Sequence, residues 1–202
     1  MADVRRDPGA RDPVLHVVAG PNGAGKTTFY ERVLAPVTHL AFVNADAIAA
    51  EEWPDDPAAA AYEAAARAAA LRTRLIGERV SFATETVFSH PSKLELLREA
   101  RAAGYRVTLH VVAVPEDLAV ARVANRVAHG GHPVPEAKVR ERYGRLFANL
   151  ADAIVMVQYA HVYDNSRAAT PFREVAVFVD GRLGRTPSWP AWMPEPLRAV
   201  GR

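Results

Sequence analysis

A glycine-rich segment at residues 20–27, reading GPNGAGKT, has the residue types and spacing of a phosphate-binding loop. Its glycines allow backbone N–H groups to turn inward and approach phosphate oxygens closely. Lys26 has the reach to contact the β- and γ-phosphates of a nucleotide, and the Thr27 hydroxyl suits a Mg²⁺ ion. The segment therefore predicts an ATP site with Mg²⁺ on Thr27. The expected ATP-binding residues are Gly20, Pro21, Asn22, Gly23, Ala24, Gly25, Lys26, Thr27 and Thr28.

Two carboxylates follow apolar runs elsewhere in the chain. Residues 39–43 lead to Asp46, and residues 80–84 lead directly to Glu85 and Thr86. Ligands of open parallel sheets bind outside the carboxyl ends of the strands, and a kinase needs a carboxylate there to orient or deprotonate the acceptor hydroxyl. We therefore expect Asp46 to act as catalytic base, and Glu85 with Thr86 to contact the acceptor or the metal. The alternative for Asp46 is that it caps a helix, and the alternative for Glu85 is that it caps a helix or forms a salt bridge.

Arginines flank the Gly/Pro-rich segment HGGHPVP at residues 129–135. This layout is typical of a basic lid, at about residues 126–145, that closes over phosphates. Arg126 is the expected catalytic cation, and His132 is expected to contact phosphate or acceptor when the lid closes. The other arginines have the alternative of local pairing on a solvated helix. The five arginines are Arg122, Arg126, Arg140, Arg142 and Arg145.

The elements that must position these residues follow from the alternation of apolar runs with helical stretches. That alternation is typical of βαβ units and predicts an α/β P-loop domain of three layers, with a mainly parallel sheet of about five strands and a C-terminal hairpin at residues 180–181. The domain is expected at residues 14–186, between a flexible tail at 1–13 and an irregular tail at 187–202. Strands are expected at 14–19, 39–43, 80–84, 107–114, 161–164 and 174–179, and helices at 26–34, 57–77, 91–103, 116–127 and 136–159.

Composition narrows the class of protein. The 202 residues include 25 Lys plus Arg against 23 Asp plus Glu, so the basic excess expected of a nucleic-acid-binding protein is missing. The chain has no cysteine, which excludes disulfides, thiolate metal sites and thiol catalysis, and fits a cytoplasmic protein. No apolar run reaches the length of a membrane span. We therefore expect neither nucleic acid nor membrane as a partner.

The chain lacks the sequence signatures of the other classes of P-loop protein. It has no N-K-x-D element of a GTPase and no L-S-G-G-Q-like element of an ABC ATPase. The fourth apolar run ends in Val-Pro at residues 114–115 rather than in the acid expected of an ABC, motor or AAA-type ATPase, and the last two would usually be longer. The run at residues 175–180 ends in Asp-Gly and is interpreted as a turn. A small kinase remains, with an ATPase switch or a nucleotide-binding regulatory module as alternatives.

An ordered series of motifs resembles the zeta-toxin family, and most closely its short bacterial stand-alone members, which are often labelled zeta toxins or predicted ABC-type ATPases. The resemblance covers residues 14–182 and implies a P-loop kinase with strand order 2-3-1-4-5. Asp46 matches the family's catalytic base, Glu85 an acceptor-site glutamate, and Arg126 a phosphate-clamping arginine. The motifs are the phosphate loop, FVNAD at 42–46, ATET at 83–86, AVP at 113–115, Arg126, GGHPVP at 130–135 and YDN at 163–165.

The same resemblance implies a substrate and a partner. Better-studied members of the family phosphorylate UDP-N-acetylglucosamine at the sugar 3′-hydroxyl and are held inactive by an antitoxin. Relatives on the same scaffold phosphorylate antibiotics or other nucleotides. The sequence departs from the family at His132, where the sugar-nucleotide kinases have a second arginine. Either Arg140 from the next helix or His132 itself is expected to replace the second arginine, and the departure leaves the identity of the acceptor open.

Overall fold

The computed structural model describes residues 12–128 and 135–201. Most of the predicted N-terminal tail at 1–13 lies outside these ranges. Residues 129–134 of the predicted lid, including His132, also lie outside them.

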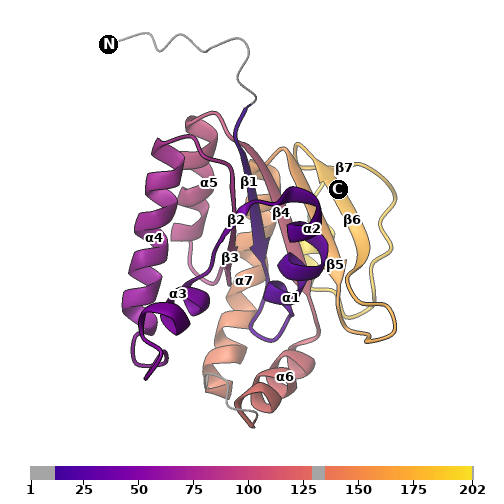
Figure 1. Ribbon diagram of the computed structural model, residues 1–202. Helices are drawn as coiled ribbons and strands as arrows, with labels where there is room; N and C mark the ends of the chain where they lie inside the picture. Colours follow the sequence, from indigo (N-terminus) through magenta and orange to yellow (C-terminus); the bar gives the residue numbers. More distant parts are fainter. Residues whose placement is uncertain (1–11, 129–134, 202) are drawn as a thin grey trace.

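The described residues form a seven-stranded sheet in the order β2-β3-β1-β4-β5-β6-β7 (Figure 1). The first five strands are parallel and have the predicted order 2-3-1-4-5, while β6 and β7 extend the sheet antiparallel beyond the five that were expected. Asp180 and Gly181 both have positive φ, at 48° and 73°, as the predicted hairpin turn requires. The strands are β1(Val14–Ala19), β2(Ala41–Val43), β3(Phe82–Thr86), β4(Arg106–Ala113), β5(Tyr159–Asp164), β6(Arg173–Val179) and β7(Arg182–Leu183).

Helices pack on both faces of the sheet. Figure 1 shows α1 and α2 in front of the sheet and α7 behind it. The larger core joins the odd-numbered side chains of β1 and β4, such as Val17 and Leu109, to helices α4, α5, α7 and α8. The smaller core joins Val18 and Val112 to Phe29 and Leu34 on the other face. The helices are α1(Lys26–Phe29), α2(Ala35–Thr38), α3(Ala45–Glu52), α4(Ala61–Gly77), α5(Ser92–Ala102), α6(Glu116–Ala128), α7(Glu136–Met156) and α8(Glu195–Ala199).

The helix that follows the phosphate loop is held against the edge of the sheet. A π-helical turn, η1(Tyr30–Leu34), joins α1 to α2. The Tyr30 ring stacks on Phe42 with ring centres 3.8 Å apart, and the Tyr30 hydroxyl donates to the Leu40 carbonyl at 2.7 Å. These contacts fix the phosphate loop relative to β2, whose end leads to Asp46.

Two segments differ from their predicted structure. Helix α3 was not predicted, and α4 begins at Ala61 rather than at residue 57. The C-terminal residues, expected to be irregular, contain α8, whose Leu197 is fully buried against the main core together with Met193. Pro196 lies in the first turn of α8, where its missing N–H costs no hydrogen bond. Burial of apolar side chains therefore outweighs the irregular local composition.

Across residues 12–128 and 135–201, every helix is too short or too polar to span a bilayer.

Three histidines lie side by side on the α1 face of the sheet. The rings of His16, His110 and His161 are stacked, with centres 5.2 and 5.6 Å apart, and His16 Nδ1 lies 2.9 Å from His110 Nε2. Burial, followed by the charges of the neighbouring histidines, holds the pKa of His110 well below its ordinary value. Burial, then His161 and Arg106, also lower the pKa of His16. Glu174, which accepts from His161 at 2.7 Å, is the acidic group at the end of this row.

The histidine row predicts a loss of stability in weak acid. His16 and His110 have lower pKa values folded than unfolded, so the unfolded chain binds more protons below about pH 6.5. The contribution of these two histidines to the free energy of unfolding is fully present above that pH. It is lost as the pH falls toward their pKa values in the folded protein. We expect urea unfolding to show at least about 1 kcal/mol less stability at about pH 5.5 than at about pH 7.5. His110→Gln should reduce that difference, whereas His90→Gln, at an exposed position, should not. An unchanged difference in His110→Gln would contradict the assignment.

Candidate nucleotide and phosphoryl-transfer site

The phosphate loop joins the end of β1 to α1 and depends on glycine at two tightly packed points. A Cβ atom on Gly20 would lie 2.1 Å from the Val112 carbonyl oxygen. A Cβ atom on Gly23 would lie 2.6 Å from the Ala119 carbonyl oxygen, and Gly23 also has φ of 78°. Only glycine fits these positions without displacing backbone of β4 or α6. The loop is therefore shaped by the elements on which it rests.

A cavity of about 500 Å³ opens at the carboxyl edge of the sheet, which is within the size range of small-molecule sites. It brings together most of the predicted site residues from four separate parts of the chain. Val87 and Ala61 line it without having been predicted. The predicted residues in the described ranges that are not among its lining residues are Gly20, Pro21, Ala24, Thr86 and Arg140. The polar lining consists of Asn22, Gly23, Gly25, Lys26, Thr27, Thr28, Asp46, Glu85, Arg122, Arg126 and Arg142.

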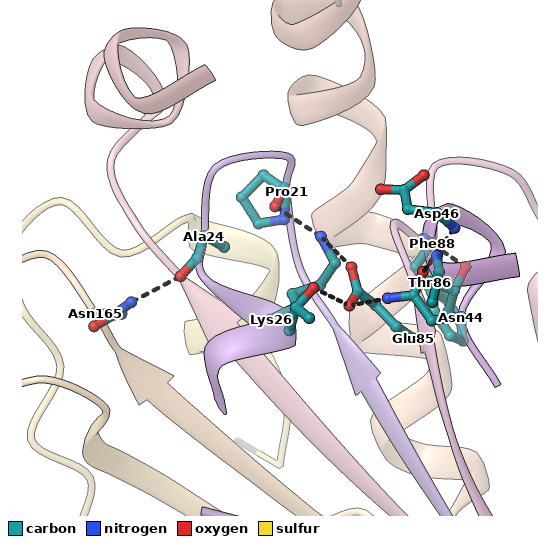
Figure 2. A network of polar contacts seen from close by, with 11 residues as sticks. Pro21, Ala24, Lys26, Asn44, Asp46, Glu85, Thr86, Phe88 and Asn165 are labelled. Atoms are coloured by element: carbon teal, nitrogen blue, oxygen red, sulfur yellow. Dashed lines mark hydrogen bonds and ion pairs between the residues drawn. The ribbon is translucent and has the colours of Figure 1, made fainter. Parts of the chain in front are cut away.

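Glu85 is the centre of a polar network at the floor of this cavity (Figure 2). Its Oε2 accepts from the Thr27 hydroxyl at 2.7 Å and from Asn44 Nδ2 at 2.9 Å. Its Oε1 lies 3.5 Å from Lys26 Nζ, which also donates to the Pro21 carbonyl at 3.1 Å. One carboxylate thus contacts both the lysine expected to bind phosphate and the hydroxyl expected to bind Mg²⁺.

The sheet explains how Glu85 reaches the loop. Strand β3 lies directly beside β1, and Glu85 is in register with Val18, two residues before the loop begins. The salt bridge that was the alternative for Glu85 does exist, but its partner is Lys26 itself. Glu85 and Thr27 are oxygen donors that fit a hard cation such as Mg²⁺.

Asp46 does not cap α3, because Asn44 is the N-cap residue of that helix. Asn44 Oδ1 accepts from the backbone N–H groups of Asp46 at 2.7 Å and Ala47 at 3.3 Å, and so caps α3. Figure 2 shows the Asp46 carboxylate directed away from the Asn44 side chain. The capping alternative therefore applies to Asn44, and the Asp46 carboxylate lines the cavity. Sequence reasoning missed Asn44, although an asparagine just before a helix is a usual capping signal.

Arg140 lies in a surface cluster of ion pairs rather than in the cavity lining. Its guanidinium donates to Glu136 at 2.9 Å and Asp117 at 3.0 Å, and it lies 3.5 Å from Glu116. The hydrogen bonds to Glu136 and then Asp117 raise the pKa of Arg140 above its ordinary value. Three carboxylates on α6 and α7 thus hold the side chain that was expected to contact substrate.

Thr86 has a local contact, since its hydroxyl accepts from the Phe88 N–H at 3.4 Å. It supports the turn after β3, outside the cavity lining.

Asn165, which follows β5, clamps the phosphate loop from outside. Its Nδ2 donates to the Ala24 carbonyl at 2.8 Å (Figure 2). Its Oδ1 accepts from the Phe172 N–H at 3.3 Å. Its own carbonyl accepts from Arg122, which also approaches the Gly23 carbonyl at 3.5 Å. In a trans peptide the C=O and the next N–H point in opposite directions, so the Gly25 N–H points away from the Asn165 side chain, and Gly25 lines the cavity. Asn165 is only 8% exposed, so its hydrogen bonds are shielded from water.

Removing this clamp should weaken phosphate binding. We expect Asn165→Ala to lower the affinity for ATP and for inorganic triphosphate by about tenfold each, because the Ala24 carbonyl loses its partner and the Gly25 N–H is no longer oriented. Titration calorimetry with both ligands measures the effect. Gln158→Ala removes a similar side-chain bond, to the Val107 N–H, far from the loop and should lower stability alone. Unchanged triphosphate affinity in Asn165→Ala would show that the clamp does not orient the loop.

Comparisons with known proteins identify a family and a sequence relative. The model of a family described as AAA domain, AAA_33, matches residues 15–148. A Haemophilus influenzae protein described as uncharacterized is 29% identical over 125 residues, which are 61% of this chain and 88% of that protein.

Solved structures share the fold. One, from the PezAT chromosomal toxin–antitoxin system of Streptococcus pneumoniae, has a TM-score of 0.62 and 15% identity, and the match covers 82% of this chain and 72% of that one. Another, AvrRxo1-ORF1:-ORF2 with ATP, has a TM-score of 0.67 and 16% identity, with 86% of this chain and 60% of that one covered. The matches confirm the P-loop fold predicted from the motifs.

Proposed function

The chain belongs to the AAA domain family AAA_33, and from that premise we propose that it is an ATP- and Mg²⁺-dependent phosphotransferase with a small-molecule hydroxyl as acceptor. One observation carries the proposal. The contacts of Glu85 with Lys26 and Thr27 place a carboxylate at the phosphate end of the loop, and Asp46, which does not cap α3, lines the same cavity. Phosphate-binding, metal-binding and proton-accepting groups therefore surround one space.

The proposed transfer needs one proton acceptor and several cations. Asp46 accepts the proton of the acceptor hydroxyl, and the hydroxyl oxygen forms a bond to the γ-phosphorus. The bond from the γ-phosphorus to the oxygen that bridges it to ADP breaks at the same time, and ADP leaves with the bonding electrons. Lys26 and Arg126 offset the charge on the phosphoryl oxygens.

Thr27 and Glu85 would hold the Mg²⁺ ion, because both present oxygen atoms at the same point of the cavity. When bound, the ion neutralises charge on the β- and γ-phosphates. In the described ranges no cluster of three or more His, Cys, Asp or Glu side chains is arranged to bind a metal by itself. Mg²⁺ usually keeps water and substrate phosphates among its ligands, so Thr27 and Glu85 need not supply the whole set.

The leading candidate for the acceptor is UDP-N-acetylglucosamine, phosphorylated at its 3′-hydroxyl. The support is the motif resemblance to the zeta-toxin family together with the fold shared with the PezAT structure. Antibiotic or nucleotide acceptors are the alternative on this scaffold. We place the enzyme in the cytoplasm, where ATP is available.

An antitoxin protein is the proposed partner. The PezAT structure comes from a toxin–antitoxin system, and the AvrRxo1-ORF1 structure contains ORF2 as a second component. Co-expression with the product of a neighbouring reading frame, followed by co-purification, tests this part of the proposal.

Hydrolysis of ATP to drive a change of partner is the second candidate function, because the family description names an AAA domain. The structure weakens this reading at one point. Strand β4 is followed by Val114 and Pro115, so it supplies no terminal acid of the kind that activates water in such ATPases.

Mass spectrometry of UDP-N-acetylglucosamine incubated with the protein, ATP and Mg²⁺ tests the acceptor. A product that gains one phosphate, and that fails to form without Mg²⁺, would support the full proposal. N-acetylglucosamine without the UDP group is the matched control for recognition of the nucleotide. An unmodified sugar nucleotide would remove this acceptor from the proposal.

A further inference from the structure

Arg142, on α7, differs from the arginines around it. It lines the cavity that contains Lys26 and Asp46, and no hydrogen bond or ion pair engages its side chain within residues 12–128 and 135–201. Its neighbours on the helix are neutralised: Arg140 by three carboxylates, and Arg145 by Glu141 at 3.1 Å. The positive charge of Arg142 is therefore available to a ligand in the cavity.

Two hydrogen bonds fix the side of α7 that faces the cavity. Asn149 Nδ2 donates to the Phe88 carbonyl at 2.9 Å, which attaches the helix to the segment after β3. The Tyr143 hydroxyl donates to the Val114 carbonyl at 2.9 Å, which attaches it to the end of β4. Arg142 precedes Asn149 by seven residues, which is about two turns or ~10.5 Å, so both lie on the same side of the helix. The helix thus presents Arg142 beyond the end of the sheet, on the β3 side.

Arg142 differs in partners or in position from the other cationic residues that line the cavity. Lys26 is paired with Glu85, and Arg122 is bound to the carbonyls of the loop and of Asn165. Arg126 comes from α6, the helix whose Ala119 packs against Gly23 of the phosphate loop. Arg142 comes from α7, whose partner segment after β3 includes Val87, the residue that lines the cavity beside Glu85.

We propose that Arg142 binds the phosphoryl group during its transfer, from the side at which Asp46 holds the acceptor. This inference rests on the proposed phosphotransferase function. As the bond to the acceptor oxygen forms, the bond to ADP breaks and the proton passes to Asp46. The guanidinium of Arg142 donates hydrogen bonds to the equatorial phosphoryl oxygens and exchanges neither proton nor electron. Such a contact stabilises the transition state more than bound ATP, so it acts on turnover rather than on nucleotide affinity.

Binding of ADP with Mg²⁺, in the presence and absence of aluminium fluoride, tests this role without knowledge of the acceptor. Aluminium fluoride with ADP mimics the phosphoryl group in transfer, so the wild-type protein should bind ADP more tightly in its presence. Arg142→Gln should keep the ADP affinity within about twofold but reduce the aluminium-fluoride-dependent gain by at least about tenfold. Arg142→Lys should restore part of the gain, and Arg145→Gln, the control on the same helix, should retain all of it.

Each other result decides against the inference. A full gain in Arg142→Gln would show that Arg142 does not contact the phosphoryl group. A wild-type protein that binds ADP but shows no gain would also overturn the role of Arg142, while leaving the nucleotide site intact. If the wild-type protein binds no ADP, the proposed function itself fails, and this outcome is distinct from the other two.

Discussion

Lys26→Ala is expected to lower ATP-dependent turnover by about 1,000-fold and to weaken ATP binding, because it removes the cation at the β- and γ-phosphates. Lys26 is 6% exposed and is held by Glu85 and the Pro21 carbonyl, so its ammonium group already faces the loop. Glu85 keeps its bonds to Thr27 and Asn44 in the variant, and the fold should persist. Titration calorimetry with a non-hydrolysable ATP analogue and a coupled assay of ADP release measure the two effects.

Lys93→Ala is the matched control for this change. Lys93 lies on α5 in a groove with Arg72, and it is not among the residues that line the nucleotide cavity. The control should bind ATP as the wild type does. Equal ATP affinity and turnover in Lys26→Ala and Lys93→Ala would exclude the loop as the phosphate site.

Asp46→Asn is expected to reduce transfer by about 100- to 10,000-fold while ATP affinity stays within about twofold. The amide cannot accept the proton of the acceptor hydroxyl, but it has nearly the shape of the carboxylate. The α3 cap is made by Asn44, which accepts from the backbone N–H of residue 46, so helix stability should not change. Comparing single-turnover transfer with ATP affinity separates the two quantities.

Glu51→Gln controls for the loss of one negative charge on the same helix. Glu51 is an acidic residue of α3 that does not line the cavity, and its replacement should leave transfer unchanged. Near-normal transfer in Asp46→Asn would contradict the assignment of Asp46 as base and move that role to another group.

The phosphate loop was predicted from its local pattern, whereas the order of the parallel strands was implied by the resemblance to the zeta-toxin family. The motif at residues 20–27 fixes a strand, a tight turn and a helix within a few residues, and the carboxyl ends of parallel strands meet at one edge. For that reason Asp46 and Glu85 were expected near the loop, and both line its cavity. Their predicted roles in catalysis remain proposals that the variants above test.

Other parts of the site depend on contacts between distant residues. Asn165 bonds to Ala24 across 141 positions of sequence, and no local pattern marks such a pair. Arg140 and Arg142 are both arginines and are two residues apart on α7. Because an α-helix turns by about 100° per residue, their side chains lie about 200° apart around the helix axis. Only the packing of α7, fixed by Asn149, shows which of the two faces the cavity.

The C-terminal segment illustrates the same limit. Its prolines and tryptophans suggested an irregular tail, and local composition carries no information on the apolar surface that α7 offers. Met193 and Leu197 are buried there, and that burial outweighs the weak helix propensity of five residues.

The most direct test of the central claim is the fate of the γ-phosphate. The protein is incubated with γ-labelled ATP, Mg²⁺ and a pooled extract of small metabolites, and the labelled products are separated and identified by mass. We predict label on an organic hydroxyl, formed by the wild type and absent with Lys26→Ala. Label recovered only as free phosphate would contradict the phosphotransferase and support an ATPase instead.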